Sequence, residues 1–427
     1  MTHANRDARR RSLRCAVLGA LVASLLALAG TASAAQPLGQ PFPLTDNARS
    51  SGQFVNYGTM AVLRADGSAA VWGNPSYGGD PAGAASSLTS GVVRIFSSYQ
   101  AMAVLKSDGS IVAWGDSGYG GDTGDPSDPT SAAARLTSGV VDVFSTSGAF
   151  AALKSDGSVV VWGDSSYGGD AGDPTDPTSA AARLTSGVVR IFAGAYAFAA
   201  LKSDGSVVVW GSFVYGGNAG DPTNPTSAAA HLTSGVVRVV STYGAFAALK
   251  DDGSVVVWGP SSRGGDPGDP TDPTSAAAHL TSGVVRIYAS SRAFAAVKSD
   301  GSVVVWGHSG YGGDPGDPTD PTSAAAHLTS GVVRVYGGES AFAALKSDGS
   351  VIAWGYRDYG GDTTCASGSP CARSAGTLTS GVVRVFASEL AFAALKDDGS
   401  VVTWGYDAGG GESTAVAGEL TGGVVDI

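Results

Sequence analysis

The sequence predicts an all-β protein, a closed β-propeller of about eight blades in which each blade is a short antiparallel meander, and three observations lead to this fold. One phrase recurs along the chain, and each of its parts occurs eight times: a Gly-Val-Val start, an apolar run such as AFAALK, an Asp-Gly-Ser turn and a Val-rich run that ends in Trp-Gly. The Trp-Gly pairs recur every 48 residues over five consecutive intervals. The two ends of the chain carry complementary parts of one repeat. Repeats that cannot bury their own apolar surface stack on their neighbours, so eight copies indicate one continuous repeat body.

Residues 1–35 precede the repeats and have the pattern of an export signal. A basic head is followed by an apolar stretch and by a small-residue cleavage site that ends at Ala34. A transmembrane anchor is the competing interpretation, but the stretch is short for a membrane span. We therefore expect a secreted, periplasmic or cell-surface protein that is cleaved near Ala34 and has no membrane span in its mature form. A linker at residues 36–53 and the propeller at residues 54–427 would follow.

Three segments of each repeat have the composition of short strands. In the fourth repeat these are Val188 to Phe192, Ala197 to Leu201 and Val207 to Trp210, which are rich in β-branched, aromatic or small apolar residues. Ser203-Asp204-Gly205 is typical of a tight hairpin, because Asp can bond its own backbone and Gly can adopt a positive φ. The third segment is apolar on both faces, which fits a sheet packed between two others.

A linker of about twenty residues separates one repeat from the next. In five repeats it is nearly constant, as in GDPTDPTSAAARLTSG from Gly172 to Gly187. Thr178 or Ser179 can cap a helix start, and the alanines favour one or two helical turns that end before Gly187. A fourth, outer strand could also lie in this linker, and the sequence alone does not place it.

The chain ends predict how the ring closes. The first repeat, Phe54 to Trp72, has no Gly-Val-Val segment before it, and the chain stops at Gly423 to Ile427, a Gly-Val-Val segment with nothing after it. If this last segment pairs with the first repeat, both open sheet edges disappear, which is how propellers protect their edges. An open array and a chain truncated within a repeat are the alternatives.

Charge and cysteine content restrict the partners. The chain has 26 basic and 37 acidic residues, and 21 and 36 without residues 1–35, so nucleic acid and anionic membrane are disfavoured as partners. Cys365 and Cys371 remain after export and lie in one Gly/Ser/Pro loop. An oxidising compartment favours a local disulfide between them, and two free thiols are the alternative.

Few residues have the pattern of a catalytic or metal site. No nucleophile-elbow, zinc-protease, P-loop or dinucleotide-binding motif occurs, and we expect no cofactor. Asp170, Asp173 and Asp176 place a carboxylate at every third residue of a linker and are weak candidates for Ca²⁺. Their spacing matches neither common calcium loop, and Asp before Pro is ordinary turn chemistry. Three linker histidines share one repeat position with arginines, which indicates a solvated site near a helix end.

The repeats resemble those of the regulator of chromosome condensation family, which also combine a Val/Ile strand, an Ala-Leu strand, an Asp-Gly turn and a strand that ends in Trp-Gly. The likeness is closer to the bacterial branch, typified by the second β-lactamase inhibitory protein, and rests on Ser186-Gly187-Val188, Ala200-Leu201-Lys202, Asp204-Gly205 and Trp210-Gly211 in matching order. It covers about residues 54–427 and implies a propeller, usually of seven blades, that binds proteins through loops on one face. Ala197-Phe198 replaces the family's His-Thr pair, and Tyr-Gly-Gly replaces its Gly-Gln-Leu-Gly, so no particular partner is implied.

Connectivity predicts where a partner would bind. The first and second strands are antiparallel, so the turn between them lies on the same side as the loop after the third strand, opposite the Asp-Gly-Ser turns. The Asp-Gly-Ser turns barely change between repeats, whereas the loops on the other side vary and contain residue types that anchor interfaces. Drift in exposed loops is the alternative explanation. The candidate binding residues are Tyr99, Tyr196, Phe213, Tyr243, Arg263, Arg292, His308, Tyr356, Arg357 and Tyr406.

Two further residue types recur in every or nearly every repeat. The tyrosine of the Tyr-Gly-Gly ending is expected to pack, and the lysine before the Asp-Gly-Ser turn is expected to pair with solvent or with the neighbouring Asp.

Taken together, the sequence predicts a secreted module that binds a protein partner and is not an enzyme. A carbohydrate- or cell-wall-binding propeller is the alternative, because rim tyrosines can stack on sugars. A propeller enzyme such as a lyase or glycosidase is the third hypothesis.

Overall fold

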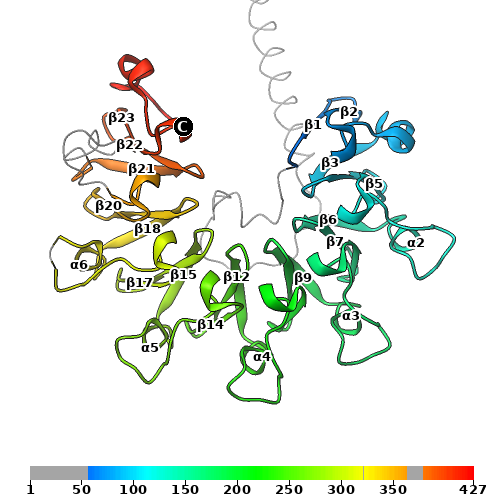
Figure 1. Cartoon of the computed structure of the whole chain (residues 1–427), viewed down its shortest axis with the longest axis horizontal. Coiled ribbons are helices and arrows are strands. Elements are labelled where there is room, and N and C mark those ends of the chain that lie inside the picture. The colour runs from blue at the N-terminus through cyan, green and yellow to red at the C-terminus, as the bar shows by residue number, and fades with distance from the viewer. Residues whose placement is uncertain (1–55, 321, 363–377) are drawn as a thin grey trace, which may run out of the picture. The chain divides into compact units, whose positions relative to one another are not determined.

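The computed structural model describes residues 56–320, 322–362 and 378–427, so the predicted signal peptide and linker lie outside the described residues. The strands form eight successive antiparallel sheets, numbered here as units 1 to 8 (Figure 1). Unit 1 has two strands, and each of units 2 to 8 has three, which follow one another as meanders. The predicted all-β fold of repeated meanders is confirmed.

The strands are β1 (Thr59–Leu63) and β2 (Ala69–Gly73) in unit 1; β3 (Val92–Ser97), β4 (Ala101–Lys106) and β5 (Ile111–Gly115) in unit 2; β6 (Val140–Ser145), β7 (Ala149–Lys154) and β8 (Val159–Gly163) in unit 3; β9 (Val188–Ala193), β10 (Ala197–Lys202) and β11 (Val207–Gly211) in unit 4; β12 (Val236–Ser241), β13 (Phe246–Lys250) and β14 (Val255–Trp258) in unit 5; β15 (Val284–Ala289), β16 (Ala293–Lys298) and β17 (Val303–Gly307) in unit 6; β18 (Val332–Gly337), β19 (Ala341–Lys346) and β20 (Val351–Gly355) in unit 7; and β21 (Val382–Ala387), β22 (Ala391–Lys396) and β23 (Val401–Gly405) in unit 8.

Short helices occupy the connections. The linkers contain α2 (Ala132–Arg135), α3 (Ala180–Arg183), α4 (Ala228–His231), α5 (Ala276–His279) and α6 (Ala324–His327), together with the 3-10 helices η2 (Ala82–Leu88) and η11 (Thr414–Leu420). Single 3-10 turns follow the last strand of each unit: η1 (Pro75–Tyr77), η3 (Ser117–Tyr119), η4 (Ser165–Tyr167), η5 (Phe213–Tyr215), η6 (Ser261–Arg263), η7 (Ser309–Tyr311), η8 (Arg357–Tyr359) and η10 (Asp407–Gly409). None of the helices described is long and apolar enough to cross a membrane.

Unit 4 illustrates why each repeat folds as predicted. β9, β10 and β11 begin where the sequence predicts strands, and each extends one residue further. In the turn between β10 and β11, the Asp204 carboxylate accepts hydrogen bonds from the Ser206 amide at 2.9 Å and from the Ser206 hydroxyl at 2.6 Å. Gly205 has a φ of +77°, which a residue with a side chain rarely adopts. The composition of the turn therefore sets the length of the hairpin.

Each first strand of units 2 to 8 contains a β-bulge, which the sequence did not predict. In unit 4 the register between β9 and β10 shifts by one residue, and Val189 is the residue left over. The bulge changes which side chains share a face. Val188 and Ile191 pack into the cluster shared with unit 3, whereas Phe192 packs against unit 5. Arg190 lies over the Phe192 ring and therefore shares its side.

Each of units 3 to 8 places a stacked aromatic pair of its own second and third strands at its junction with the preceding unit. Phe198 and Trp210 stack with ring centroids 5.1 Å apart, and both are buried. The Trp210 Nε1–H donates to the backbone oxygen of Gly168 in unit 3 at 3.0 Å. Equivalent tryptophans and glycines pair at all seven successive junctions. Burial of each such phenylalanine contributes about 1.5–3 kcal/mol, so packing between units stabilises the whole array, as it does in propeller blades.

The linkers form the predicted helical turns. Ser179 begins α3, and its side-chain oxygen accepts from the Ala182 amide at 3.2 Å. The Lys202 ammonium donates to the carbonyl oxygen of Arg183 at the end of this helix, at 2.9 Å. The recurring lysine thus satisfies a helix end, a role that the sequence did not indicate. In units 2 to 7 the first residue of each third strand donates to a leucine carbonyl of the following linker, and no described sheet contains a fourth strand.

Units 1 and 8 each carry one half of a further junction. Trp72 in unit 1 is 50% exposed, whereas the exposure of the other seven tryptophans runs from 0% for Trp404 to 5% for Trp114. Gly410 in unit 8 follows a 3-10 turn, as do the glycines that accept from tryptophan elsewhere. A Cβ placed on Gly410 would meet no atom within 4 Å. The donor position of unit 1 and the acceptor position of unit 8 are therefore complementary.

The C-terminal segment is held by unit 8 in the way that a first strand is held by the preceding unit. The Val424 amide donates to the Gly399 carbonyl at 3.0 Å, and the Val188 amide donates to Gly157 in the same way at 2.9 Å. Residues 424–427 nevertheless form no strand, and within the described residues β1 pairs only with β2. The predicted pairing of this segment with unit 1 is absent from the structure, although its bond to unit 8 is the one that a first strand makes to the preceding unit. Closure of the ring stays a prediction.

Candidate binding surface

Two loops of each unit lie on one side of its sheet. The first loop joins the first and second strands, and the second loop is the 3-10 turn after the third strand. In unit 2 the Asp116 amide of the second loop donates to the Gln100 carbonyl of the first loop at 3.0 Å. In unit 4 the Ser212 amide donates to the Tyr196 carbonyl at 2.9 Å. We refer to the surface formed by these loops as the loop face. Strand connectivity predicted that these two loops would lie on the same side.

Backbone hydrogen bonds connect the first loops from one unit to the next. The Tyr99 amide donates to the Ser147 carbonyl at 2.9 Å, Ser147 donates to Ala195 at 2.9 Å, and Ala195 donates to Tyr243 at 3.0 Å. The complete row is Tyr57, Tyr99, Ser147, Ala195, Tyr243, Ser291, Glu339 and Glu389. At this position the backbone is fixed while the side chain differs from unit to unit. Loops fixed in this way lose little conformational entropy when they bind a partner.

In units 2, 3, 5 and 6 a buried hydroxyl joins the two loops of the unit, whereas Gly194 and Gly338 occupy this position in units 4 and 7. The Thr146 side-chain oxygen accepts from the Ala149 amide at 3.0 Å, and its O–H donates to the Tyr167 carbonyl at 2.8 Å. Equivalent pairs of bonds are made by Ser98, Thr242 and Ser290. Because one hydroxyl satisfies both loops, the neighbouring side chains can change without loosening the backbone that carries them.

Four tyrosines and one arginine form an aromatic cluster on the loop face of units 3 to 5. Tyr196 stacks on Tyr167 and on Tyr215, with centroid distances of 5.0 and 4.4 Å. Its ring also meets Tyr243 edge to face at 5.5 Å. The Arg263 guanidinium lies 5.1 Å from the Tyr243 ring and 5.8 Å from the Tyr215 ring. Three of the predicted residues, Tyr196, Tyr243 and Arg263, are therefore in one cluster.

The surroundings of Tyr196 and Tyr167 favour the neutral form of their hydroxyl groups. A hydrogen bond with the Tyr243 hydroxyl at 3.4 Å, together with burial, raises the pKa of Tyr196 well above its ordinary value. Burial also raises the pKa of Tyr167. A neutral phenol both donates and accepts hydrogen bonds, so the cluster offers polar edges beside its stacked rings.

Arg292, His308 and Phe213 lie near this cluster in sequence but outside it. The Arg292 guanidinium lies 4.5 Å from the Tyr311 ring, and the His308 ring meets the same tyrosine edge to face at 5.1 Å. Phe213 projects from η5 with 76% of its surface exposed. A large apolar side chain that is this exposed is a candidate anchor for a partner.

The predicted residues of units 7 and 8 form a second aromatic group. Tyr356 and Tyr406 both contact Tyr359, with centroid distances of 5.1 and 5.8 Å. Arg357 is exposed beside them and forms an ion pair with Asp362 at 3.6 Å. Charge and aromatic surface therefore alternate along this part of the loop face.

Sequence reasoning missed one residue and underestimated others. Tyr57 stacks on Tyr99 with centroids 5.2 Å apart. It occupies the repeat position of Tyr99 and Tyr243, and this shared position was the signal that could have identified it. The Tyr-Gly-Gly tyrosines were expected only to pack, but they also contact the variable residues. Tyr167 and Tyr215 stack on the two faces of the Tyr196 ring, and the Tyr311 ring contacts Arg292.

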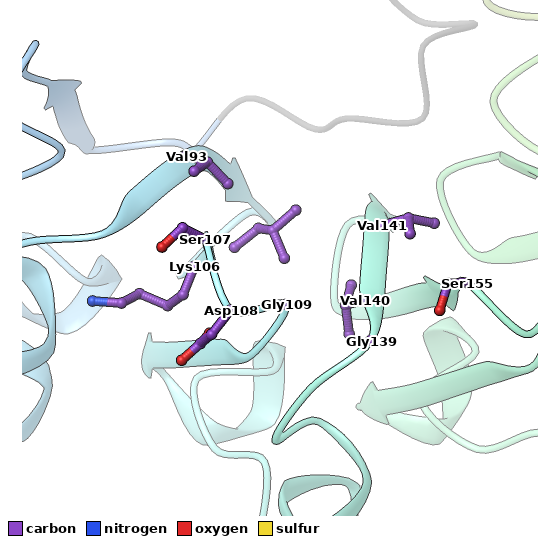
Figure 2. Close-up of a pocket in the computed structure, with 10 residues that line it drawn as sticks. Val93, Lys106, Ser107, Asp108, Gly109, Gly139, Val140, Val141 and Ser155 are labelled. Atoms are coloured by element: carbon purple, nitrogen blue, oxygen red, sulfur yellow. The ribbon is translucent and has the colours of Figure 1, made fainter. Parts of the chain in front are cut away.

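The side with the Asp-Gly-Ser turns has a different character. A shallow depression of about 440 Å³ lies between units 2 and 3, lined by Val93 and Val141 of two first strands and by Lys106 and Asp108 (Figure 2). These residue types recur at the same positions throughout units 2 to 8. The depression is thus a product of the repeat, and the loop face is where the units differ.

The remaining candidates do not converge on one site. Asp170, Asp173 and Asp176 are exposed, and each accepts from an amide two residues further on, at 2.8, 2.8 and 2.9 Å. Across the described ranges, no three His, Cys, Asp or Glu side chains are grouped closely enough to hold a metal ion. Cys365 and Cys371 lie outside the described residues, so their disulfide stays a prediction.

Comparison with known proteins gives remote structural likeness only. No protein-family model matches the chain, and no curated protein matches it. Two structures of Prp20 from Saccharomyces cerevisiae are similar: one is 17% identical, with a TM-score of 0.36, and covers 62% of this chain and 72% of that one. The other, with Kap60 bound, is 13% identical, with a TM-score of 0.37, and covers 89% and 87%. The CRINKLY WD40 ectodomain of the Arabidopsis thaliana receptor kinase ACR4 is 16% identical, with a TM-score of 0.34, and covers 72% and 93%.

Proposed function

We propose that this protein is an exported binding module that recognises a protein partner through the loop face and has no catalytic activity. The supporting observation is that units of nearly identical sequence differ in the side chains of the loop face, where the backbone hydrogen bonds from Tyr57 to Glu389 fix the first loops. The variable side chains include tyrosine, phenylalanine and arginine, the types that anchor protein interfaces. The resemblance of the repeats to the bacterial branch of the regulator of chromosome condensation family is in line with this assignment.

The packing of the aromatic cluster favours a protein partner over a carbohydrate. Sugars bind to the open faces of aromatic rings, but both faces of Tyr196 are occupied by Tyr167 and Tyr215. What remains accessible are ring edges, phenol hydroxyls and the Arg263 guanidinium, which suit the mixed polar and apolar surface of a protein. Phe213 beside the cluster and Tyr356 in unit 7 add exposed apolar area to the loop face.

Capture of a partner tests the proposal. The mature protein, immobilised, is exposed to the proteins secreted by the source organism, the captured protein is identified, and its affinity is measured with purified components. Combined replacement of Phe213, Tyr243, Arg292 and Tyr356 by Ala should weaken binding by about 100-fold or more, because anchors of this kind each contribute about 2 kcal/mol or more. The melting temperature should change little.

A matched control replaces Arg183, His231 and His279 by Ala, since these are exposed linker residues away from the loop face. This control should bind as the unchanged protein does. Equal losses in both variants would contradict a site on the loop face. Retention on cell-wall polysaccharide with no captured protein would instead favour the carbohydrate hypothesis.

A further inference from the structure

The loop face of units 5 and 6 carries two arginines whose charges no described residue neutralises. Arg263 and Arg292 are partly exposed, and within the described part of the chain neither side chain forms an ion pair or donates a hydrogen bond. Arg357 of the same face differs, because it forms an ion pair with Asp362 at 3.6 Å. Acidic residues outnumber basic ones by 36 to 21 outside residues 1–35, so the lack of a carboxylate beside these two arginines is a local property of the surface.

Tyrosine rings hold both guanidinium groups in place. The Arg263 guanidinium lies 5.1 Å from the centroid of the Tyr243 ring and 5.8 Å from that of Tyr215, and the Arg292 guanidinium lies 4.5 Å from that of Tyr311. A ring attracts the cation through its π face but replaces none of its hydrogen-bond acceptors, so the five N–H donors of each guanidinium remain available. Each fork is therefore fixed and still able to bind a carboxylate, and it loses little side-chain entropy on binding.

The fold brings the two arginines to adjoining loops. The Tyr243 amide of unit 5 donates to the Ser291 carbonyl of unit 6 at 2.8 Å, and Arg292 is the next residue. The turn that carries Arg263 lies against the same loop, since a Cβ placed on Gly264 would be 3.4 Å from the Arg292 carbonyl oxygen. Both arginines thus belong to one part of the loop face, and one segment of a ligand can reach both.

Exposed apolar side chains accompany these arginines. Phe213 and Val214 of η5 are 76% and 63% exposed. The next residue, Tyr215, is one of the two rings that the Arg263 guanidinium contacts. We refer to Phe213, Val214, Arg263 and Arg292 as the arginine patch. It combines apolar area with two fixed cations, the combination that anchors protein interfaces.

Acidic residues lie on the loop face of the units before and after the arginine patch. Asp164 is in the second loop of unit 3, where its amide donates to the Gly148 carbonyl at 3.0 Å. Glu339 is in the first loop of unit 7, where its amide donates to the Glu389 carbonyl at 2.7 Å. A ligand carboxylate is attracted by the patch and repelled by the units that flank it, which restricts where it can bind.

We propose that the arginine patch binds an acidic segment of the protein partner. Two side-chain carboxylates of this segment accept hydrogen bonds from Arg263 and Arg292, and an apolar side chain covers Phe213 and Val214. This inference rests on the proposed function and names the chemistry of the partner's contact. An anionic polysaccharide fits the patch less well, because it has little apolar surface to place on the phenylalanine.

A fluorescent peptide tests this chemistry directly. The probe has about 12 residues, with a central Phe and with Glu at alternating positions, and two control peptides have Gln or Lys in place of Glu. By anisotropy, the mature chain should bind the Glu peptide about tenfold or more tightly than the Gln peptide and should bind the Lys peptide most weakly. The difference between the Glu and Gln peptides should shrink as salt is added. Equal binding of the three peptides, or no binding of any, would overturn the proposal.

Protein variants locate the site. Arg263→Gln with Arg292→Gln should weaken binding of the Glu peptide by about tenfold or more, whereas Arg135→Gln with Arg183→Gln, which removes the same charge from two linkers, should change it by less than about twofold. Glu339→Gln should strengthen binding of the Glu peptide, because it removes a flanking negative charge. Equal effects of the two arginine variants would refute the site. If the first variant does not fold, Arg263→Lys with Arg292→Lys keeps the charge and should still reduce the preference for Glu over Gln, because Lys lacks the planar fork; an unchanged preference would refute the site.

The same variants, measured with the captured partner, separate this inference from the proposed function. A partner that binds through the loop face but keeps its affinity for Arg263→Gln with Arg292→Gln would refute the acidic segment and leave the proposed function standing. Peptide discrimination through these arginines without any captured partner would support the patch and contradict the proposed function. Heparin that binds through the same arginines more tightly than the Glu peptide would assign the patch to a polysaccharide and refute the acidic segment.

Discussion

At the scale of the residue, the Trp210 side chain contributes to its junction in two ways. Its ring stacks on Phe198, and its Nε1–H satisfies a buried glycine carbonyl of the preceding unit. Replacement of Trp210 by Phe keeps an aromatic ring but leaves this carbonyl unsatisfied and creates a small cavity. We expect a loss of about 2–4 kcal/mol in the free energy of unfolding, measured from urea denaturation. An unchanged denaturation midpoint would contradict the role assigned to the Trp–Gly bond.

The arginines and tyrosines of the loop face show a limit of sequence reasoning at this scale. Tyr196, Tyr243 and Arg263 were predicted singly, as variable residues, and the structure brings them into one cluster. Their residue types could be read from the chain. Their contact could not, because it depends on where the Tyr-Gly-Gly tyrosines of two units place their rings.

At the scale of the element, the eight Asp-Gly-Ser turns predict how stability depends on pH. In every turn, hydrogen bonds from the serine hydroxyl and amide lower the pKa of the aspartate: Asp66, Asp108, Asp156, Asp204, Asp252, Asp300, Asp348 and Asp398. An unfolded aspartate titrates at about 3.9. Because the folded pKa is lower, the unfolded chain takes up protons first as the pH falls, and the stabilisation present above about pH 4 is lost below it.

We therefore expect the melting temperature to be nearly constant between about pH 7 and 5 and to fall steeply below about pH 4. Asn accepts the same backbone hydrogen bond but does not titrate. A variant with Asn in place of Asp156, Asp204, Asp252 and Asp300 should start from a lower melting temperature and show a shallower acid decline. Parallel declines of variant and parent would mean that other carboxylates control the acid transition.

The same elements show which parts of the fold the sequence determines locally. Strands β9 to β11 and the turn at Asp204 were predicted within one residue, because hairpin chemistry and β-branched runs act over a few neighbouring positions. The bulge at Val189 was not predicted, since it depends on the register with the second strand. The capping role of Lys202 was also missed, because its acceptor lies 19 residues away in a linker.

At the scale of the whole molecule, the unmatched halves at units 1 and 8 predict ring closure. In a closed eight-unit ring, Trp72 would donate to Gly410 as Trp210 donates to Gly168, and the C-terminal segment would complete the two-stranded sheet of unit 1. Trp72→Phe should then cost about 2 kcal/mol or more, comparable to Trp210→Phe. Deletion of residues 421–427 should lower the melting temperature strongly or cause aggregation, because it opens two sheet edges.

The comparison of these two tryptophan variants distinguishes the alternatives. A half-exposed indole at the end of an open array loses little on conversion to Phe, so a negligible effect of Trp72→Phe would contradict closure. If unit 1 of one molecule instead pairs with unit 8 of another, the apparent mass in size-exclusion chromatography would rise with protein concentration. Trp72→Phe would then weaken this self-association and leave the free energy of unfolding unchanged.

The repeated Trp–Gly bond also bears on how this gene can change. Five of the seven junctions join residues that are 42 positions apart, and the donor and acceptor belong to the same places of the 48-residue phrase in each case. Recombination between two copies of the phrase would insert or remove one full unit. Every junction would still join a tryptophan and a glycine at the same positions of the phrase. The junctions therefore place no limit on the number of units, and if the ring closes, the limit comes from the requirement that the first and last units meet.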